Sequence, residues 1–394
     1  MRIALVCPDD LSVVLFCKGI VQTLQRMDRN EVYVISDVFG DDGYYSRILS
    51  SWGVRHVISK ITRYIDPLRD LKLMSSLCGV FRREKIQVVI NISTKPNILG
   101  TIAARIAHID QILCSVWGRG SIFVEDAGLK TRFLAMVLSR LYALAFRLTS
   151  KAWFTNSHDL EFFRSHKLVP EKKVIVTKNY VSTEDYVPVS LSPEKETILR
   201  RDLGIGPYDK VVIMVGRMIW AKGVREFVNA SKLLRDRLPD IKFVLVGPLE
   251  KGSPDAVPET YLKESEKQGN FFWAGFRRDV KDLYALAALA VLPSYYKEGG
   301  YPRALTEPMA MGKPVITTDS ADCRAPVEEG KNGYLVPIKD PQALANAIER
   351  LMRDEELRKE FGRYSRIKAV QEFDEKTIVH HVMNEFLKGN MNIP

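Results

Sequence analysis

Short apolar runs rich in β-branched residues alternate with longer stretches of helical periodicity along almost the whole chain. The runs are continuous rather than alternating with polar residues, which is typical of buried parallel strands covered by helices on both faces. In the first half they are Ile3–Val6, Val32–Ile35, Val88–Ile92, Gln111–Val116, Ala152–Phe154 and Val174–Val176. In the second half they are Val211–Val215, Phe243–Val246, Phe271–Trp273, Ala288–Leu292, Val315–Thr317 and Tyr334–Val336. The pattern predicts an α/β protein with parallel sheets.

A polar stretch from Thr183 to Glu196, which contains Pro188 and Pro193, separates the two series of runs and predicts an interdomain linker. We therefore expect two Rossmann-like, doubly wound domains, residues 1–188 and 189–374, that face each other across a cleft. Ligands in such sheets bind beyond the carboxyl ends of the strands. The segment 354–387 predicts two helices with a break near residue 373, and we expect the terminal helix, within 375–394, to complete the first domain.

The net charge of +10 is uneven, because residues 1–190 hold 26 Lys and Arg against 18 Asp and Glu, a net of +8. A positive field of this kind attracts nucleic acid, an anionic membrane or a phosphorylated substrate, and ordinary solvated surface is the alternative. No basic–aromatic interleaving favours nucleic acid. The five cysteines are widely spaced, which indicates neither a zinc site nor a disulfide framework and fits a cytoplasmic protein.

One predicted helix, residues 129–149, combines an apolar stripe with flanking cations. Its internal arginines make it a poor membrane span. Two interpretations stay open: the stripe packs inward as core, or the helix lies in a membrane interface with its basic residues toward anionic lipid. The stripe consists of Phe133, Met136, Val137, Leu141, Leu144 and Leu148, and the cations are Lys130, Arg132, Arg140, Arg147 and Lys151.

Two loops after predicted strands carry candidate chemistry. In the first, Gly216 ends a strand, and Arg217 and Lys222 follow before a helix that starts near residue 224. A glycine turn, two cations and the N–H groups of a helix N-terminus together suit a diphosphate. In the second loop, Glu298 and Glu307 flank a pair of glycines whose bare backbone would let a sugar approach.

These two stretches, with their spacing, resemble the retaining GT-B glycosyltransferases of glycosyltransferase family 4. Members carry a G-R-x4-K-G loop and, further along, two glutamates followed by a run like Met309-Ala-Met-Gly312-Lys-Pro314-Val-Ile316. The glutamates here are nine residues apart, one more than in the family, and we place the extra residue at Gly299–Gly300. Gly247-Pro248 and Gly275 to Val280 also match turns of the family.

The first half resembles the branch that builds bacterial surface polysaccharides or glycans on a lipid carrier. The matching runs are Thr94–Gly100, Gly118-Arg119-Gly120 and Phe154–Leu160. The resemblance implies a UDP-sugar donor, a polyprenyl-diphosphate-linked saccharide as acceptor, and a peripheral position on the inner face of the cell membrane. Two alternatives remain: a catalytically silent module that binds a saccharide or a partner, and the same chemistry on a soluble acceptor.

Carried onto this chain, the resemblance implies a role for each motif residue. Arg217 and Lys222 would hold the diphosphate and neutralise the leaving group, and Glu307 would bond the ribose hydroxyls. Glu298, with Gly299 and Gly300, would contact the donor sugar, and Arg217, Lys222 and Glu298 are the catalytic candidates. Gly216, Gly247, Phe276 and Arg277 would line the nucleotide site. For the diphosphate of the acceptor we select the cations Lys18, Lys95 and Arg119. Because no Asp-x-Asp occurs, we expect no metal and no cofactor.

Overall fold

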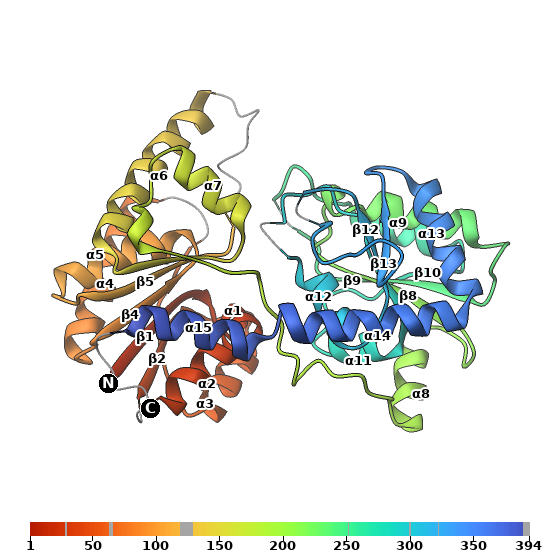
Figure 1. Ribbon diagram of the computed structural model, residues 1–394, viewed down its shortest axis with the longest axis horizontal. Coiled ribbons are helices and arrows are strands. Elements are labelled where there is room, and N and C mark those ends of the chain that lie inside the picture. The colour runs from red at the N-terminus through yellow and green to blue at the C-terminus, as the bar shows by residue number, and fades with distance from the viewer. Residues whose placement is uncertain are drawn as a thin grey trace. The chain divides into compact units, whose positions relative to one another are not determined.

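The computed structural model describes residues 1–27, 30–62, 66–118, 129–250, 252–298, 301–321 and 323–388, with the backbone alone for 129–131. These residues form two compact units, one of residues 1–178 with 375–394 and one of residues 179–374 (Figure 1). The chain thus leaves the first unit after Lys178 rather than at residue 188, and it returns there at Glu375.

The first unit is built on a parallel sheet in the order β3-β2-β1-β4-β5-β6-β7. Its central strands β4 and β5 are almost wholly buried, in keeping with their continuous apolar sequences. The strands are β1 (Arg2–Asp9), β2 (Glu31–Asp37), β3 (Arg55–Ile58), β4 (Val88–Ile92), β5 (Gln111–Val116), β6 (Lys151–Phe154) and β7 (Val174–Val176). Strand β3 was not expected from the sequence.

Helices cover both faces of this sheet. One layer contains α4 (Pro67–Arg83), α5 (Thr101–Ile106), which follows a π-helical turn (Pro96–Gly100), and α6 (Leu129–Leu148). The other contains α1 (Asp10–Phe16), α2 (Lys18–Arg26), α3 (Tyr44–Ser51) and the returning helix α15 (Glu375–Leu387) (Figure 1). A short helix α7 (Ser157–Ser165) follows β6. The Glu375 carboxylate accepts a hydrogen bond of 3.1 Å from the Gly19 amide and so joins α15 to α2.

The second unit has a parallel sheet in the order β10-β9-β8-β11-β12-β13. Its strands are β8 (Lys210–Val215), β9 (Ile241–Val246), β10 (Phe271–Trp273), β11 (Ala287–Leu292), β12 (Val315–Thr318) and β13 (Gly333–Val336). Its helices are α8 (Pro193–Asp202), α9 (Val224–Leu234), α10 (Glu259–Glu266), α11 (Val280–Leu286), α12 (Arg303–Ala310), α13 (Pro341–Arg353) and α14 (Glu355–Glu372). Separate apolar cores lie on the two faces of the sheet.

Side-chain caps explain where many of these helices begin. Asp9, for example, accepts a hydrogen bond of 2.7 Å from the Ser12 amide at the start of α1. A short polar side chain in this position satisfies an amide that the helix itself leaves unpaired. Asp66, Asn156, Ser192, Asp340 and Asp354 cap α4, α7, α8, α13 and α14 in the same way.

The stretch Thr183–Glu196 is not a free linker as the sequence suggested. Tyr186 and Leu191 pack against the core of the second unit, and the Arg366 guanidinium donates to the carbonyls of Thr183 and Tyr186 at 3.0 and 2.9 Å. Part of this stretch is therefore fixed to the second unit through its backbone carbonyls.

Helix α6 packs inward with a face other than the expected stripe. Leu138, Tyr142, Ala145 and Phe146 are buried against β5 and β6, while the side chains of the stripe are exposed except that of Leu148, which is half-buried. Phe133 is 64% exposed and Met136 48% exposed. Val137, Leu141 and Leu144 are also exposed. The interpretation of the stripe as core is therefore wrong, because Tyr142 and Phe146 fill that place.

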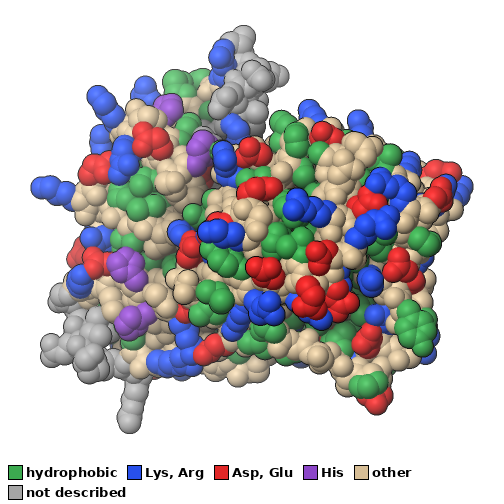
Figure 2. Space-filling view, turned by 45° about the vertical axis from the view of Figure 1, so that its right-hand side comes forward, with side chains coloured by type: hydrophobic (Ala, Val, Ile, Leu, Met, Phe, Trp, Pro, Cys, Tyr) green, Lys and Arg blue, Asp and Glu red, His purple; other side chains and the backbone are tan. Residues whose placement is uncertain are grey.

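The cations of the chain are not gathered into one continuous patch on the face shown in Figure 2, where Lys, Arg, Asp and Glu side chains are interspersed. Among the described helices, none is both long and apolar enough to span a bilayer.

Each sheet has one place where the chain reverses its direction of winding. In the first unit it lies between β1 and β4, and in the second between β8 and β11. Connections diverge from such a pair of strands, which leaves a crevice at their carboxyl ends where ligands of open α/β sheets bind. The two loops singled out in the sequence follow β8 and β11, so both lie at the crevice of the second unit.

Candidate functional site

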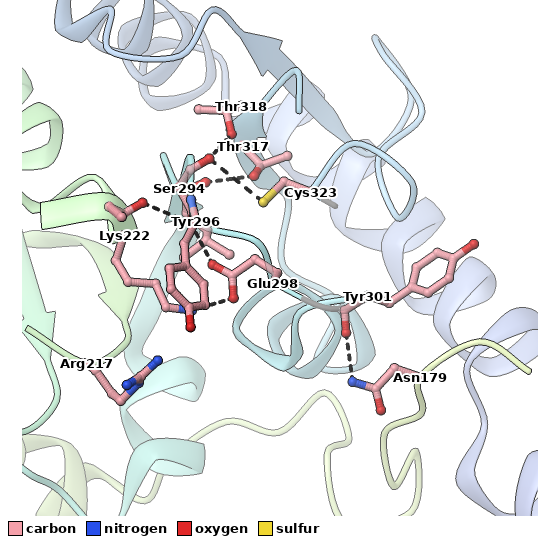
Figure 3. A network of polar contacts seen from close by, with 12 residues as sticks. Asn179, Arg217, Lys222, Ser294, Tyr296, Glu298, Tyr301, Thr317, Thr318 and Cys323 are labelled. Atoms are coloured by element: carbon pink, nitrogen blue, oxygen red, sulfur yellow. Dashed lines mark hydrogen bonds and ion pairs between the residues drawn. The ribbon is translucent and has the colours of Figure 1, made fainter. Parts of the chain in front are cut away.

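The loop after β8 is held in place by backbone hydrogen bonds to the segment that follows β9. The amides of Met218 and Trp220 donate to the carbonyls of Pro248 and Asp255 at 3.0 and 2.9 Å. Met218 and Ile219 are buried and anchor the middle of the loop. Arg217 and Lys222, on either side of this anchor, extend toward the same ring, that of Tyr296 (Figure 3).

Two glycines allow the loops to approach one another. Gly223 has a φ of +84°, and a Cβ there would lie 2.2 Å from the Pro293 carbonyl oxygen at the end of β11. Gly247, after β9, has a φ of +148°, and its Cβ would lie 1.7 Å from the Gly216 carbonyl oxygen. No side chain fits at such distances, so glycine is required for both close approaches.

Ser294 links the loop after β11 to the loop after β8. Its hydroxyl lies 2.6 Å from Glu298 Oε1 and 3.2 Å from the Ala221 carbonyl oxygen, and the Ser294 carbonyl accepts from the Thr318 hydroxyl (Figure 3). The Ala221 carbonyl also accepts from the Tyr295 amide at 2.8 Å. The two loops therefore form one connected structure.

Glu298 and Lys222 form an ion pair within this structure. The Glu298 side chain is 6% exposed and that of Lys222 13%. One carboxylate oxygen of Glu298 binds Lys222 and the other accepts from Ser294, so the carboxylate has a fixed orientation. A buried pair of this kind costs desolvation, which its hydrogen bonds must offset, and its best-supported effect is to fix geometry. Glu298 thus positions Lys222.

Arg217 lies at the outer side of the site. Its Nη1 donates to Glu250 Oε2 at 3.2 Å. Burial alone would lower the pKa of Arg217, but Tyr296 and Glu250 outweigh it and raise that pKa. The guanidinium therefore stays charged, and its side chain keeps 37% of its surface accessible.

Glu307, on α12, lies in a second polar cluster of the same unit. Arg303 Nε donates to its Oε1 at 2.8 Å. Burial raises the pKa of Glu307, while Arg303 and the hydroxyl of Tyr186 oppose that rise. The carboxylate is thus supported by groups from α12 and from the segment before α8.

The remaining nucleotide-site candidates lie at the carboxyl ends of β9 and β10. The Gly247 amide donates to the Gly275 carbonyl at 2.8 Å, Phe276 is exposed, and Arg277 makes a two-pronged ion pair with Asp279. The structure therefore brings Gly216, Gly247 and Gly275 together at adjacent strand ends. Gly299 and Gly300 lie outside the described residues, so their expected sugar contact stays a prediction.

The acceptor candidates are placed differently from one another. Lys95 follows β4, at the crevice of the first unit, and its Nζ binds Asp70 Oδ1 at 2.5 Å and Thr62 Oγ1 at 3.0 Å. Lys18 begins α2, one helix beyond the loop after β1. Arg119 lies outside the described residues. The position of Lys95 fits a ligand site best, and the acceptor role of all three residues stays a prediction.

Sequence reasoning missed four residues that support the site: Ser294, Tyr296, Glu250 and Tyr186. Ser294 and Tyr296 stand in the run that ends in Glu298, and their places after a strand were the available signal. Glu250 and Tyr186 act over long sequence separations, and no local pattern marks them. Within the described ranges, no three His, Cys, Asp or Glu side chains gather in a geometry that suits a metal ion.

Comparison with known proteins gives a family match in the second unit. Residues 195–368 match the family model described as glycosyl transferases group 1. A protein from Campylobacter jejuni, named N,N'-diacetylbacillosaminyl-diphospho-undecaprenol α-1,3-N-acetylgalactosaminyltransferase, is 28% identical over the full length of both chains. An Escherichia coli protein, named UDP-Gal:α-D-GlcNAc-diphosphoundecaprenol α-1,3-galactosyltransferase, is 26% identical over 83% of this chain and 82% of its own.

Solved structures show the same fold. The Anabaena protein HepE, crystallised with UDP and glucose, aligns with a TM-score of 0.76 and 20% identity over 98% of this chain and 100% of its own. A glycosyltransferase from Rickettsia africae aligns with a TM-score of 0.78 and 17% identity over 99% of both chains. The two parallel α/β units are thus the pair found in GT-B structures.

Proposed function

We propose a specific reaction for this chain, which is a glycosyltransferase and whose residues 195–368 belong to the glycosyl transferases group 1 family. The enzyme moves a hexose or N-acetylhexosamine from a UDP-sugar to a polyprenyl-diphosphate-linked saccharide, retains the anomeric configuration, and needs no metal. The product extends a surface polysaccharide or glycan.

One observation carries this proposal: Arg217 and Lys222 both contact the Tyr296 ring in the loops that follow β8 and β11. Two cations beside a glycine turn and a helix N-terminus suit a diphosphate. The names of the Campylobacter and Escherichia coli relatives both specify a diphospho-undecaprenol acceptor, and the HepE crystals contain UDP, which supports the choice of donor and acceptor.

The chemistry follows from where charge develops. As the bond between the sugar C1 and the phosphate oxygen breaks, negative charge grows on the leaving UDP, and Arg217 and Lys222 stabilise it. Glu307 accepts hydrogen bonds from the ribose hydroxyls. The acceptor hydroxyl forms the new bond to C1 on the face that UDP leaves, and its proton passes to the departing phosphate oxygen. No side-chain base is required.

The first unit offers a surface for the membrane that holds such an acceptor. Exposed apolar side chains run along α6 beside Arg132, Arg140 and Arg147, which are exposed as well. An apolar face flanked by cations binds the interface of an anionic bilayer. We infer that α6 lies on the inner face of the cell membrane.

A direct assay tests the proposal. The purified chain is given a panel of UDP-sugars with a polyprenyl-diphosphate-linked saccharide, and the anomeric configuration of the product is determined by NMR. We expect transfer with retention and full activity in EDTA. Inversion, a strict metal requirement, or transfer only to soluble sugars would each contradict the corresponding part of the proposal.

A further inference from the structure

The side chain of Tyr296 contacts both cations of the site, although the sequence motifs assign it no role. Its ring centroid lies 5.7 Å from Arg217 Cζ and 5.2 Å from Lys222 Nζ. Figure 3 shows the ring beside the end of Lys222, with the hydroxyl pointing toward Arg217. Both distances are within about 6 Å, the range in which a cation is attracted to an aromatic ring. The Tyr296 hydroxyl also accepts a hydrogen bond from the Arg217 guanidinium.

Tyr296 is held in this position by the backbone. Its amide donates to the Ser294 hydroxyl at 3.1 Å, and the preceding amide, of Tyr295, donates to the loop after β8. The rings of Tyr295 and Tyr296 contact different cations, because the Tyr295 ring lies 4.8 Å from Lys339 Nζ. Only the second ring of this pair contacts Arg217 and Lys222 among the described contacts.

The carboxylates of the site cannot replace this ring. Glu250 and Glu298 hold Arg217 and Lys222 through ion pairs, and a carboxylate both neutralises a cation and occupies its N–H donors. A diphosphate would have to compete for those same donors. The face of an aromatic ring attracts a cation while leaving its charge and most of its donors available.

We propose that Tyr296 is a positioning residue for the donor diphosphate: it contacts both Arg217 and Lys222 and holds these cations at the site without neutralising their charge. The inference rests on the proposed function, in which this site binds a nucleoside diphosphate. It adds a specific prediction, namely that the ring, through Lys222, matters more than the hydroxyl, which contacts Arg217 alone.

Calorimetric titration of the full chain with UDP tests the inference. Tyr296→Leu removes the ring, Tyr296→Phe keeps it, and Tyr295→Leu is the matched control on the adjacent residue. We expect UDP to bind Tyr296→Leu about tenfold more weakly than wild type, since the contacts to both cations are lost. Tyr295→Leu should bind UDP within about twofold of wild type. Tyr296→Phe, which loses only the hydroxyl contact to Arg217, should bind UDP more tightly than Tyr296→Leu does. Uridine has no phosphate, so its affinity should differ much less between Tyr296→Leu and wild type than the affinity of UDP does.

Three outcomes would overturn the inference: wild-type UDP affinity in Tyr296→Leu, an equal loss in Tyr296→Phe, or an equal loss in Tyr295→Leu. Circular dichroism and the melting temperature check that each variant folds, and Tyr296→Met, which also lacks a ring, replaces Tyr296→Leu if that variant does not fold. Failure of the wild-type chain to bind UDP would instead refute the proposed donor, and would be seen before any variant is compared.

Discussion

At the scale of single residues, the charged residues of the motifs could be found from the sequence, but the side chains that hold them in place could not. Arg217 and Lys222 stand at fixed offsets from a glycine at a strand end, a local pattern. Tyr186 supports Glu307 across 121 positions of chain, which follows from the two residue numbers, and only folding brings them together. Side-chain contacts of this range leave no periodic trace in a single sequence.

Replacing Lys222 by Ala should lower kcat/KM by about 100-fold or more, because one preorganised charge on a leaving group contributes this much. The melting temperature should also fall, because the buried Glu298 carboxylate loses its cation, and circular dichroism checks that the variant is folded. Lys210→Ala, at the opposite end of β8, is the control. Steady-state kinetics of both variants test this prediction. Near-wild-type activity of Lys222→Ala would show that Lys222 does not act on the leaving group.

Replacing Tyr186 by Phe should shift the pH dependence of the enzyme. The Tyr186 hydrogen bond lowers the pKa of Glu307, which burial has raised, so its loss raises that pKa further. Less of the carboxylate is then ionised at a given pH, and the acidic limb of kcat/KM should move to higher pH. Tyr208→Phe, at a highly exposed tyrosine, should leave the profile unchanged. A shift toward lower pH would contradict the assignment.

At the scale of elements, the strands with continuous apolar sequences were predictable and the edge strand β3 was not. Its four residues, Arg55 to Ile58, contain two polar side chains and are only partly buried, so they lack the pattern of a covered strand. Which face of α6 meets the sheet could not be decided from the sequence for a related reason. Its sequence carries apolar residues on more than one side, and periodicity alone does not tell which side meets the sheet.

The close approach of the loops after β8 and β9 predicts a large cost for a side chain at Gly247. Gly247→Ala should reduce the free energy of unfolding by about 3 kcal/mol, from backbone strain and from overlap with the Gly216 carbonyl. Gly269 also has a positive φ but open space around it, so Gly269→Ala should cost only about 1 kcal/mol. Urea denaturation compares the two, and equal losses would show that the contact is unimportant.

At the scale of the whole molecule, the division into two α/β units was predictable from the two series of runs, but the position of the boundary was not. We predicted the boundary in a polar stretch because it contains Pro188 and Pro193, whereas the chain leaves the first unit at Lys178. Burial of Tyr186 and Leu191 in the second unit depends on tertiary packing, which composition does not report.

The exposed stripe of α6 predicts binding to anionic liposomes at low salt. In a flotation assay the wild-type chain should float with the vesicles, and the double variant Phe133→Ser with Leu144→Ser should remain largely in the soluble fraction. Ile367→Ser, at an exposed apolar residue of α14, is the control and should float like wild type. Equal flotation of the double variant would assign membrane binding to another surface.

The return of α15 to the first unit has a consequence for biosynthesis. Domains tend to fold as they leave the ribosome, but the partner that pairs with Gly19 emerges only after residues 179–374 have been translated. The second unit is continuous and meets no such delay. Ribosome-bound chains of residues 1–374, extended by a flexible linker that clears the exit tunnel, should therefore carry a protease-resistant second unit and a first unit that is cleaved readily. Protection of the first unit should appear when α15 is included before the linker.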